Sequence, residues 1–169
     1  MKIEGMFYQI ESFIKNPTAG LPEKVFLFLS KMTPLIHIDL LIKNEQSETL
    51  LIWRDDQYYG HGGHVPDGII RYKESIANRF RKVAMTELNA EVDFKPTPLS
   101  INEIIVIRTE RGYFIFLLYE CELLMPPGEK LKYKDNGNPK NGEWIWHKKY
   151  SNNIIKVHEI SRKFIDETR

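Results

Sequence analysis

The feature that most constrains this fold is a change of hydrophobic period along the chain. Residues 35–43 and 49–53 form two nearly continuous apolar runs, which are typical of buried strands. The polar stretch 44–48 joins them, so we expect a β-hairpin or two neighbouring strands. From residue 74 to residue 88 apolar side chains instead recur at helical spacing. Strands followed by such a helix predict an α/β (α+β) chain.

Shorter patterns extend this prediction over the whole chain. Two amphipathic helices are expected first, at 3–15 and 22–31, where Asn16-Pro17 and Thr33-Pro34 end them. The other expected elements are strands at 101–108, 113–124 and 143–147, a turn at 110–112, a loop at 126–142 and a last helix at 153–167. Residues 1–32 are therefore interpreted as a helical extension and 33–169 as one domain with a mixed sheet between helices.

Composition describes an ordinary globular protein. The 169 residues are enough for one compact domain. With 24 basic and 23 acidic side chains the net charge is +1, which gives no reason to expect nucleic-acid or membrane binding. Cys121 lies in an apolar run and is interpreted as a buried, inert thiol. The first residues are too often interrupted by polar side chains for a signal peptide or membrane span, so a cytoplasmic location is expected.

The segment from residue 68 to residue 90 carries the clearest chemical pattern. A glycine turn at Gly68 leads into the predicted helix, whose first turn should carry Glu74, and Glu87 follows more than three turns later. A backbone turn at a helix start with a nearby carboxylate can hold a divalent cation and a diphosphate. The alternative is a solvated amphipathic helix on which Glu74 interacts with the helix dipole.

This segment resembles a Nudix box, whose usual form is G-x5-E-x7-R-E-U-x-E-E-x-G-U, where U is apolar. Gly68 and Glu74 match the opening, and Glu87 matches the last glutamate. The usual arginine, two of the glutamates and the last glycine are replaced by Lys82, Val83, Thr86 and Asn89.

The altered box is more similar to that of the GDP-mannose mannosyl hydrolases. The similarity continues upstream in T-P-L-I-H-I-D-L at 33–40, L-L-I-W-R at 50–54 and V-P-D-G at 65–68. It implies a Nudix-like α/β/α sandwich. It also implies water attack on the sugar carbon of a nucleotide sugar, one Mg²⁺ (or Mn²⁺) on the leaving diphosphate, and a homodimer.

The resemblance also implies roles for individual residues. Glu87 would bind the metal with help from the backbone carbonyl of Asp67, and Glu74 would orient the site, through Lys82. Arg54 would stabilise the departing diphosphate. Asp39 would contact the nucleotide or sugar, and Tyr113 the diphosphate or leaving group.

A general base is missing from the expected place. The branch supplies a further metal ligand and its base from a stretch near the end, which aligns here on Lys140 and Asn141. An ammonium repels a metal, and an amide is not a base near neutral pH. Another residue must therefore be the base, or the reaction has changed.

Histidines are the remaining candidates for that base. His61 and His64 lie in the glycine-rich stretch 59–64 before the box, which would otherwise be a surface loop. Neither has a partner at zinc-ligand spacing. His147 is a further candidate, whereas His37 is interpreted as an interior histidine.

Two functions remain open from the sequence. The first is a Mg²⁺-dependent hydrolase of a nucleoside diphosphate linked to a sugar or similar group. The second is a non-catalytic Nudix-fold module that binds or senses a nucleotide sugar. The missing base and the replacement of glycine by Asp67 and Asn89 favour the second.

Overall fold

The computed structural model describes residues 2–107, 110–134, 137–150 and 153–167. Along the chain these residues form α1 (Ile3–Ser12), α2 (Glu23–Ser30), β1 (Leu35–Ile42), β2 (Thr49–Asp56), β3 (Gly60–His64), β4 (Asp67–Ile69), α3 (Ile76–Val83), the π-helical turn η1 (Ala84–Leu88), β5 (Val92–Phe94), β6 (Ser100–Ile105), β7 (Tyr113–Leu123), the 3₁₀ turn η2 (Glu129–Leu131), β8 (Trp144–His147), the 3₁₀ helix η3 (Lys156–Ser161) and α4 (Arg162–Asp166).

The strands form two sheets. In the larger sheet the order is β4-β1-β7-β5, and β6 also pairs with β7. Strands β1 and β7 are parallel while the other pairs are antiparallel, so this sheet is mixed. The smaller sheet has the antiparallel order β3-β2-β8.

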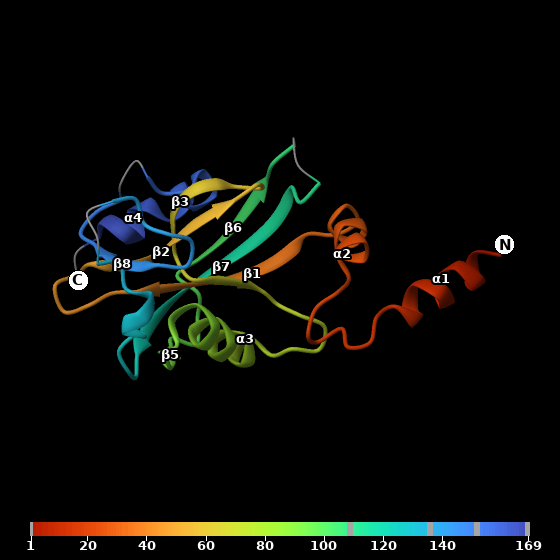
Figure 1. The fold of residues 1–169 in the computed structure, drawn as a ribbon, viewed down its shortest axis with the longest axis horizontal. Helices are drawn as coiled ribbons and strands as arrows, with labels where there is room; N and C mark the ends of the chain where they lie inside the picture. The colour runs from red at the N-terminus through yellow and green to blue at the C-terminus, as the bar shows by residue number, and fades with distance from the viewer. Residues whose placement is uncertain (1, 108–109, 135–136, 151–152, 168–169) are drawn as a thin grey trace.

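Alternating side chains on β1 place helices on both sides of the sheets. Ile38 and Leu40 join the cluster that contains Phe80 of α3, whereas Leu41 joins the cluster that contains Ile165 of α4. Each of these buried side chains contributes roughly 1.5–3 kcal/mol relative to exposure. Figure 1 shows α3 on one side of the sheets and α4 on the other, beside β2 and β3. The predicted α/β/α architecture with a mixed sheet is confirmed.

The box helix begins later than predicted. Its N-cap is Ser75, whose Oγ accepts the Asn78 N–H at 3.2 Å, so Glu74 precedes the helix instead of lying in its first turn. The last turn widens into π-helix and ends at Asn89, whose φ is 48°. Asparagine tolerates this left-handed conformation, which explains why it can stand where the usual box has glycine.

Two predictions for the first half of the domain are corrected. The glycine-rich stretch before the box is strand β3, paired with β2, and not a loop. A Cβ at Gly62 would lie 2.5 Å from the backbone oxygen of Asn153, so glycine permits this strand to lie close to the later segment. Strands β1 and β2 belong to different sheets and share one isolated bridge, Lys43 to Thr49, so of the two expected alternatives the hairpin is wrong and two neighbouring strands are present.

The ends of several elements also differ from the sequence prediction. The last helix is largely 3₁₀ and begins at Lys156, and the short strand β5 was not predicted. The predicted end of the 101–108 strand at residue 108 lies outside the described residues. Strand β7, strand β8 and the reversal between β6 and β7 are confirmed.

The two leading helices differ in how they meet the rest of the chain. Phe26 of α2 packs against the buried cluster of Leu35, Phe114 and Phe116. Helix α1 buries no residue and extends away from the sheets (Figure 1). Its exposed apolar side chains include Ile3, Met6, Phe7 and Ile10, and the exposed Phe13 follows directly after the helix. Among the described helices, none combines the length and the apolar character needed to cross a membrane.

Candidate functional site

The centre of the site is the Asp67 carboxylate, at the start of β4. Its Oδ1 lies 2.6 Å from Arg54 Nη2 and 3.2 Å from His64 Nδ1, and its Oδ2 lies 3.0 Å from His37 Nδ1. Burial alone would raise the pKa of Asp67, but hydrogen bonds from His37 and His64 and the charge of Arg54 lower it well below its usual range. Asp67 is therefore a buried anion.

Glu87 lies beside this anion, in the π-helical turn that follows α3. Its Oε2 accepts the backbone N–H of Asp67 at 3.3 Å. Burial and the negative charge of Asp67 raise the pKa of Glu87 to about 8, and the positive charge of Arg54 opposes them. Glu87 thus exchanges its proton close to neutral pH.

A pocket of about 320 Å³ opens onto Glu87 and onto Arg54, the ion-pair partner of Asp67. Arg54, His64 and Glu87 line it, together with Thr86 and Asn141. The structure therefore brings three of the predicted site residues to one cavity, although they come from β2, β3 and the turn after α3.

His64 is buried, so the interpretation of its segment as a surface loop is wrong. It is 2% exposed, and its Nδ1 lies 2.7 Å from the Val65 carbonyl oxygen. A carbonyl oxygen can only accept, so Nδ1 carries a proton and a neutral ring keeps its lone pair on Nε2. His61, on the same strand, is exposed.

The other predicted histidines lie in different surroundings. His37 is buried and bonded to Asp67, as the interior interpretation predicts. His147 lies on β8, opposite Thr49 of β2. It lines a separate pocket that is also lined by Asn153. Burial lowers the pKa of His147.

One histidine in the cluster was not predicted. His158 of η3 is 1% exposed, with its ring centroid 5.8 Å from that of His64 and its Nδ1 3.8 Å from Asp39 Oδ2. Burial lowers the pKa of His158 to about 3, so the ring is neutral. His158 lies 91 residues after Asp67 and 71 residues after Glu87, so no local spacing could have indicated it.

Asp39 is enclosed and does not line the pocket. It is 1% exposed and lies opposite Asp67 in the β1–β4 pair. Burial, followed by the charge of Asp67, raises the pKa of Asp39 well above its usual range. A direct contact between Asp39 and a nucleotide stays a prediction, and it requires the cluster to open.

Tyr113 lies at the start of β7. Its hydroxyl donates to Glu103 Oε1 at 2.9 Å, across the β6–β7 pair. It is not among the residues that line the Arg54 pocket. Its predicted contact with the diphosphate or leaving group stays a prediction.

Glu74 fixes the turn into α3. Its Oε2 accepts the Arg71 N–H at 3.0 Å and Arg79 Nε at 2.8 Å, while Oε1 lies 2.8 Å from Lys82 Nζ. The expected contact with Lys82 is present, and Arg79 is an additional partner that the sequence comparison did not indicate. Glu74 orients the segment between Gly68 and the helix.

Gly68 permits β4 to lie directly against that helix. A Cβ at this position would lie 2.6 Å from Val83 Cγ2 and 3.0 Å from Arg79 Cδ. The first glycine of the box is therefore required here by packing, since both contacts come from α3.

The donor set fits one hard cation at the box, held weakly. Val83 is buried and Thr86 donates its hydroxyl to the Lys82 carbonyl, so Glu87 is the carboxylate that this helical segment offers to the pocket. Carboxylate and carbonyl oxygens suit Mg²⁺, which normally completes its shell with water and phosphate oxygens.

Asn141 lines the same pocket, and its Oδ1 accepts the Asp55 N–H at 3.0 Å. Lys140 is exposed.

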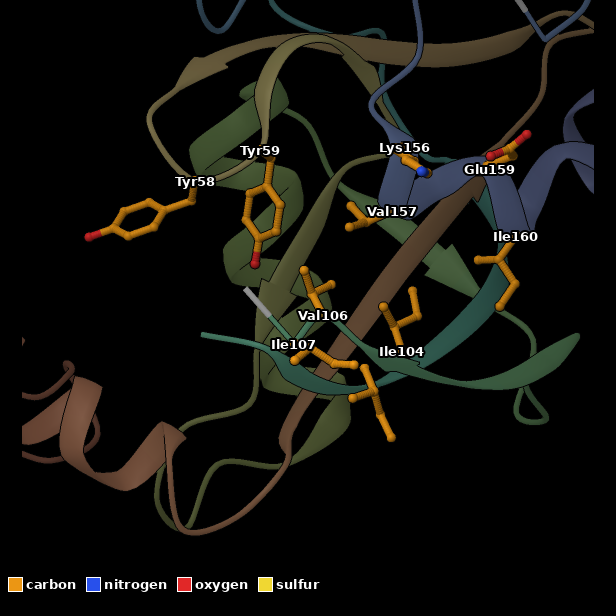
Figure 2. Close-up of a pocket in the computed structure, with 10 residues that line it drawn as sticks. Tyr58, Tyr59, Ile104, Val106, Ile107, Lys156, Val157, Glu159 and Ile160 are labelled. Carbon is orange, nitrogen blue, oxygen red and sulfur yellow. The ribbon is translucent and has the colours of Figure 1, made fainter. Parts of the chain in front are cut away.

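A larger apolar groove lies next to the Arg54 pocket. It has a volume of about 900 Å³ and is bounded by Tyr59, the end of β6 and η3. Figure 2 shows Tyr59 directed toward Val106 and Ile107, with Tyr58 pointing away from them. The Tyr59 ring centroid lies 6.0 Å from the Arg54 guanidinium carbon, so the groove adjoins the cationic end of the site.

Comparison with known proteins gives structural matches only. No protein-family model and no curated protein matches the sequence. A MutT Nudix hydrolase from Burkholderia pseudomallei is similar with a TM-score of 0.60 at 13% identity, over 78% of this chain and 97% of that chain. A UDP-X diphosphatase is similar with a TM-score of 0.57 at 13% identity, over 96% of this chain and 88% of that chain. A Nudix hydrolase from Nitrosomonas europaea has a TM-score of 0.51 at 14% identity, over 80% of this chain and 82% of that chain. This chain has the fold of the Nudix hydrolases.

Proposed function

We propose that this protein hydrolyses a nucleoside diphosphate linked to a sugar, of the GDP-mannose type, with Mg²⁺ or Mn²⁺. The observation that carries the proposal is the single pocket lined by Arg54, His64 and Glu87. In this pocket Arg54 would bind phosphate, His64 would accept a proton from water, and the carboxylate of Glu87 would bind a metal.

The chemistry we propose is attack by water on the sugar carbon. The carbon–oxygen bond breaks, the nucleoside diphosphate departs with the electron pair, and the water proton passes to His64 Nε2. Arg54 would stabilise the departing charge through the paired N–H groups of its guanidinium. Glu87 and the carbonyl of residue 67 would hold the metal, which neutralises the diphosphate when bound.

The neighbouring groove supports a nucleotide as the leaving group. Tyr59 lines the groove, and its ring centroid lies 6.0 Å from the Arg54 guanidinium carbon and 5.9 Å from that of Arg111. A base resting against Tyr59 would place its phosphates toward the guanidinium, because stacking and charge pairing then act on adjacent parts of one ligand.

A second candidate is a non-catalytic module that binds the same ligand. The observation that favours it is the 2.6 Å contact between Arg54 and Asp67, whose carboxylate is 5% exposed. An arginine already paired with a buried carboxylate is less available to a phosphate, and transition-state stabilisation would then be weak.

Incubation with a panel of nucleotide sugars, with and without Mg²⁺, tests the proposal. Hydrolysis in isotopically labelled water should release nucleoside diphosphate and place the label in the sugar. Label in phosphate would mean attack at phosphorus. Binding without any product would support the non-catalytic module.

We also propose a homodimer that covers α1. This helix buries no residue within its own chain, and an exposed apolar face of this kind normally meets a partner. Light scattering of the full chain and of Phe7→Ser measures the mass directly. A monomer at micromolar concentration would contradict the proposal.

A cytoplasmic location also stays a prediction.

A further inference from the structure

A second group of potential ligands lies behind the box, in the interior. His64, Asp67 and His158 can each place one donor atom within 4.8 Å of the others, and all three are buried. Two imidazoles and one carboxylate differ in chemistry from the oxygen donors around Glu87. We propose that His64, Asp67 and His158 form a site for a first-row transition-metal ion such as Zn²⁺, separate from the Mg²⁺ position at the box.

The nitrogen donors determine the class of cation. Imidazole binds Zn²⁺ and its neighbours in the first transition row well, whereas Mg²⁺ prefers oxygen donors throughout its shell. Three protein ligands would leave one tetrahedral position for water or a substrate oxygen. Donor atoms bound to one Zn²⁺ lie roughly 3.4 Å apart, given bond lengths of about 2.0–2.2 Å. The present separations therefore require a small closure of the cluster.

Unpartnered polar atoms inside the cluster point to the same conclusion. His158 Nδ1 and Asp39 Oδ1 are buried and have no hydrogen-bond partner. An interior polar atom without a partner is costly, and a bound ion is one way to satisfy it. Asp39 Oδ2 lies 3.8 Å from His158 Nδ1, so this carboxyl group is placed to become a further ligand of an ion held by that nitrogen.

Three carboxyl groups lie close together beside this site. Asp39 lies opposite Asp67 in the β1–β4 pair, and Glu87 Oε2 accepts the Asp67 N–H at 3.3 Å. Arg54 Nη2 lies 2.6 Å from Asp67 Oδ1 on the pocket side. The oxygen-rich surroundings suit a divalent cation better than an anion.

Access and ligand geometry are compatible with binding. His64 lines the open pocket, so an ion can reach the cluster from that side. His64 Nδ1 is the ring nitrogen that lies 3.2 Å from Asp67 Oδ1, so an ion shared by these two atoms would displace the Nδ1 proton and its bond to the Val65 carbonyl. His64 is also the proposed general base, so Zn²⁺ should inhibit any hydrolysis, although the binding tests below do not depend on activity.

Cobalt is the probe for this site because its visible absorption reports ligand geometry. Full-length protein is freed of metal by dialysis against chelator and titrated with Co²⁺ in excess Mg²⁺. We expect visible bands that saturate at about one equivalent and disappear when Zn²⁺ is added. His64→Gln and His158→Gln should each abolish saturable binding. The matched control is His61→Gln, an exposed histidine on the same strand, which should bind Co²⁺ like the wild type.

A second measurement protects the test against variants that fail to fold. Zn²⁺ should raise the melting temperature of the wild-type protein, because a ligand that binds only the native state stabilises it. Asp39→Asn should weaken Co²⁺ binding by about 10–100-fold, because it removes the carboxylate beside His158 Nδ1. Two results would overturn the proposal: a wild-type protein without Co²⁺ bands or Zn²⁺ stabilisation, or bands that survive both histidine substitutions.

Discussion

Arg54 Nη2 and Asp67 Oδ1 lie 2.6 Å apart, and this ion pair joins the open pocket to the buried cluster. Arg54 is 20% exposed while Asp67 is 5% exposed. The guanidinium therefore has one side against a fixed carboxylate and another toward the cavity. Whether the guanidinium hydrogen-bonds mainly to Asp67 or also to a phosphate in the cavity decides whether the site can stabilise a departing diphosphate.

Arg54→Lys tests how the side chain is shared between Asp67 and a phosphate. An ammonium keeps the charge but loses the paired N–H groups. It therefore binds Asp67 and a phosphate at the same time less well than a guanidinium does. We expect turnover to fall about 10–100-fold, with a smaller loss of ground-state binding, because charge accumulates in the transition state. Single-turnover kinetics on a verified substrate measures both quantities.

The control for this substitution is Arg81→Lys, on the exposed side of α3. It should leave the kinetics unchanged. Equal rates for Arg54→Lys and wild type would make Arg54 a structural residue and favour the binding module.

Glu87→Gln tests the assignment of the metal ligand at the box. The amide keeps the shape of the carboxyl group but carries no charge for a cation. We expect Mg²⁺-dependent nucleotide-sugar binding, measured by calorimetry, to be lost while any metal-independent binding remains. Glu91→Gln, an exposed residue four positions later, is the control. If Mg²⁺ still strengthens binding to Glu87→Gln, another residue holds the metal.

Sequence patterns located the parts of the site that are close in the chain or lie on regular elements. Arg54 at the end of an apolar run, Gly68 before a helix and Glu87 on that helix are visible in this way. The fold then brings Arg54 and Glu87 to one pocket.

Long-range packing accounts for what the sequence did not indicate. His158 reaches His64 only because η3 folds back against β3, where Gly63 bridges to Ile154. Glycines in β3 resembled a loop, although here they permit a close approach between segments. Where tertiary contact and local propensity conflict, the contact decides the structure.

Glu74 should make stability depend on pH. Burial opposes ionisation, but hydrogen bonds from Lys82, the Arg71 N–H and Arg79 prevail and lower the pKa of Glu74 below its ordinary 4.5. The stabilisation is thus fully present above the unfolded pKa and is lost as pH falls through the folded pKa. Glu74→Gln should cost about 1–3 kcal/mol near pH 7.

Urea unfolding at two pH values checks this dependence. The difference between Glu74→Gln and wild type should be full near pH 7 and should shrink as the pH is lowered below 4.5, as the wild-type carboxyl becomes protonated in the folded protein. Glu11→Gln, on the exposed helix α1, should differ little from wild type at either pH. A constant difference at both values would mean that the charge of Glu74 is unimportant and that its packing matters instead.

Gly68 and Val83 offer a test of why the box opens with glycine. Gly68→Ala would place a Cβ 2.6 Å from Val83 Cγ2, closer than two carbon atoms can approach. Both positions are in packed structure, so we expect a loss of about 1–3 kcal/mol from overpacking. Gly137→Ala is the control, because a Cβ there meets nothing within 4 Å.

The double variant Gly68→Ala with Val83→Ala separates the contact with Val83 from the contact with Arg79. Val83→Ala alone should destabilise by leaving a cavity beside β4. In the double variant the new methyl group enters that space. The free energy of unfolding lost by the double variant should therefore be smaller than the sum of the two single losses, by at least about 0.5 kcal/mol. Chemical denaturation of the four proteins measures this coupling. Additive losses would show that Val83 does not restrict position 68 and that the contact with Arg79 Cδ, 3.0 Å from the new Cβ, accounts for the cost of the methyl group.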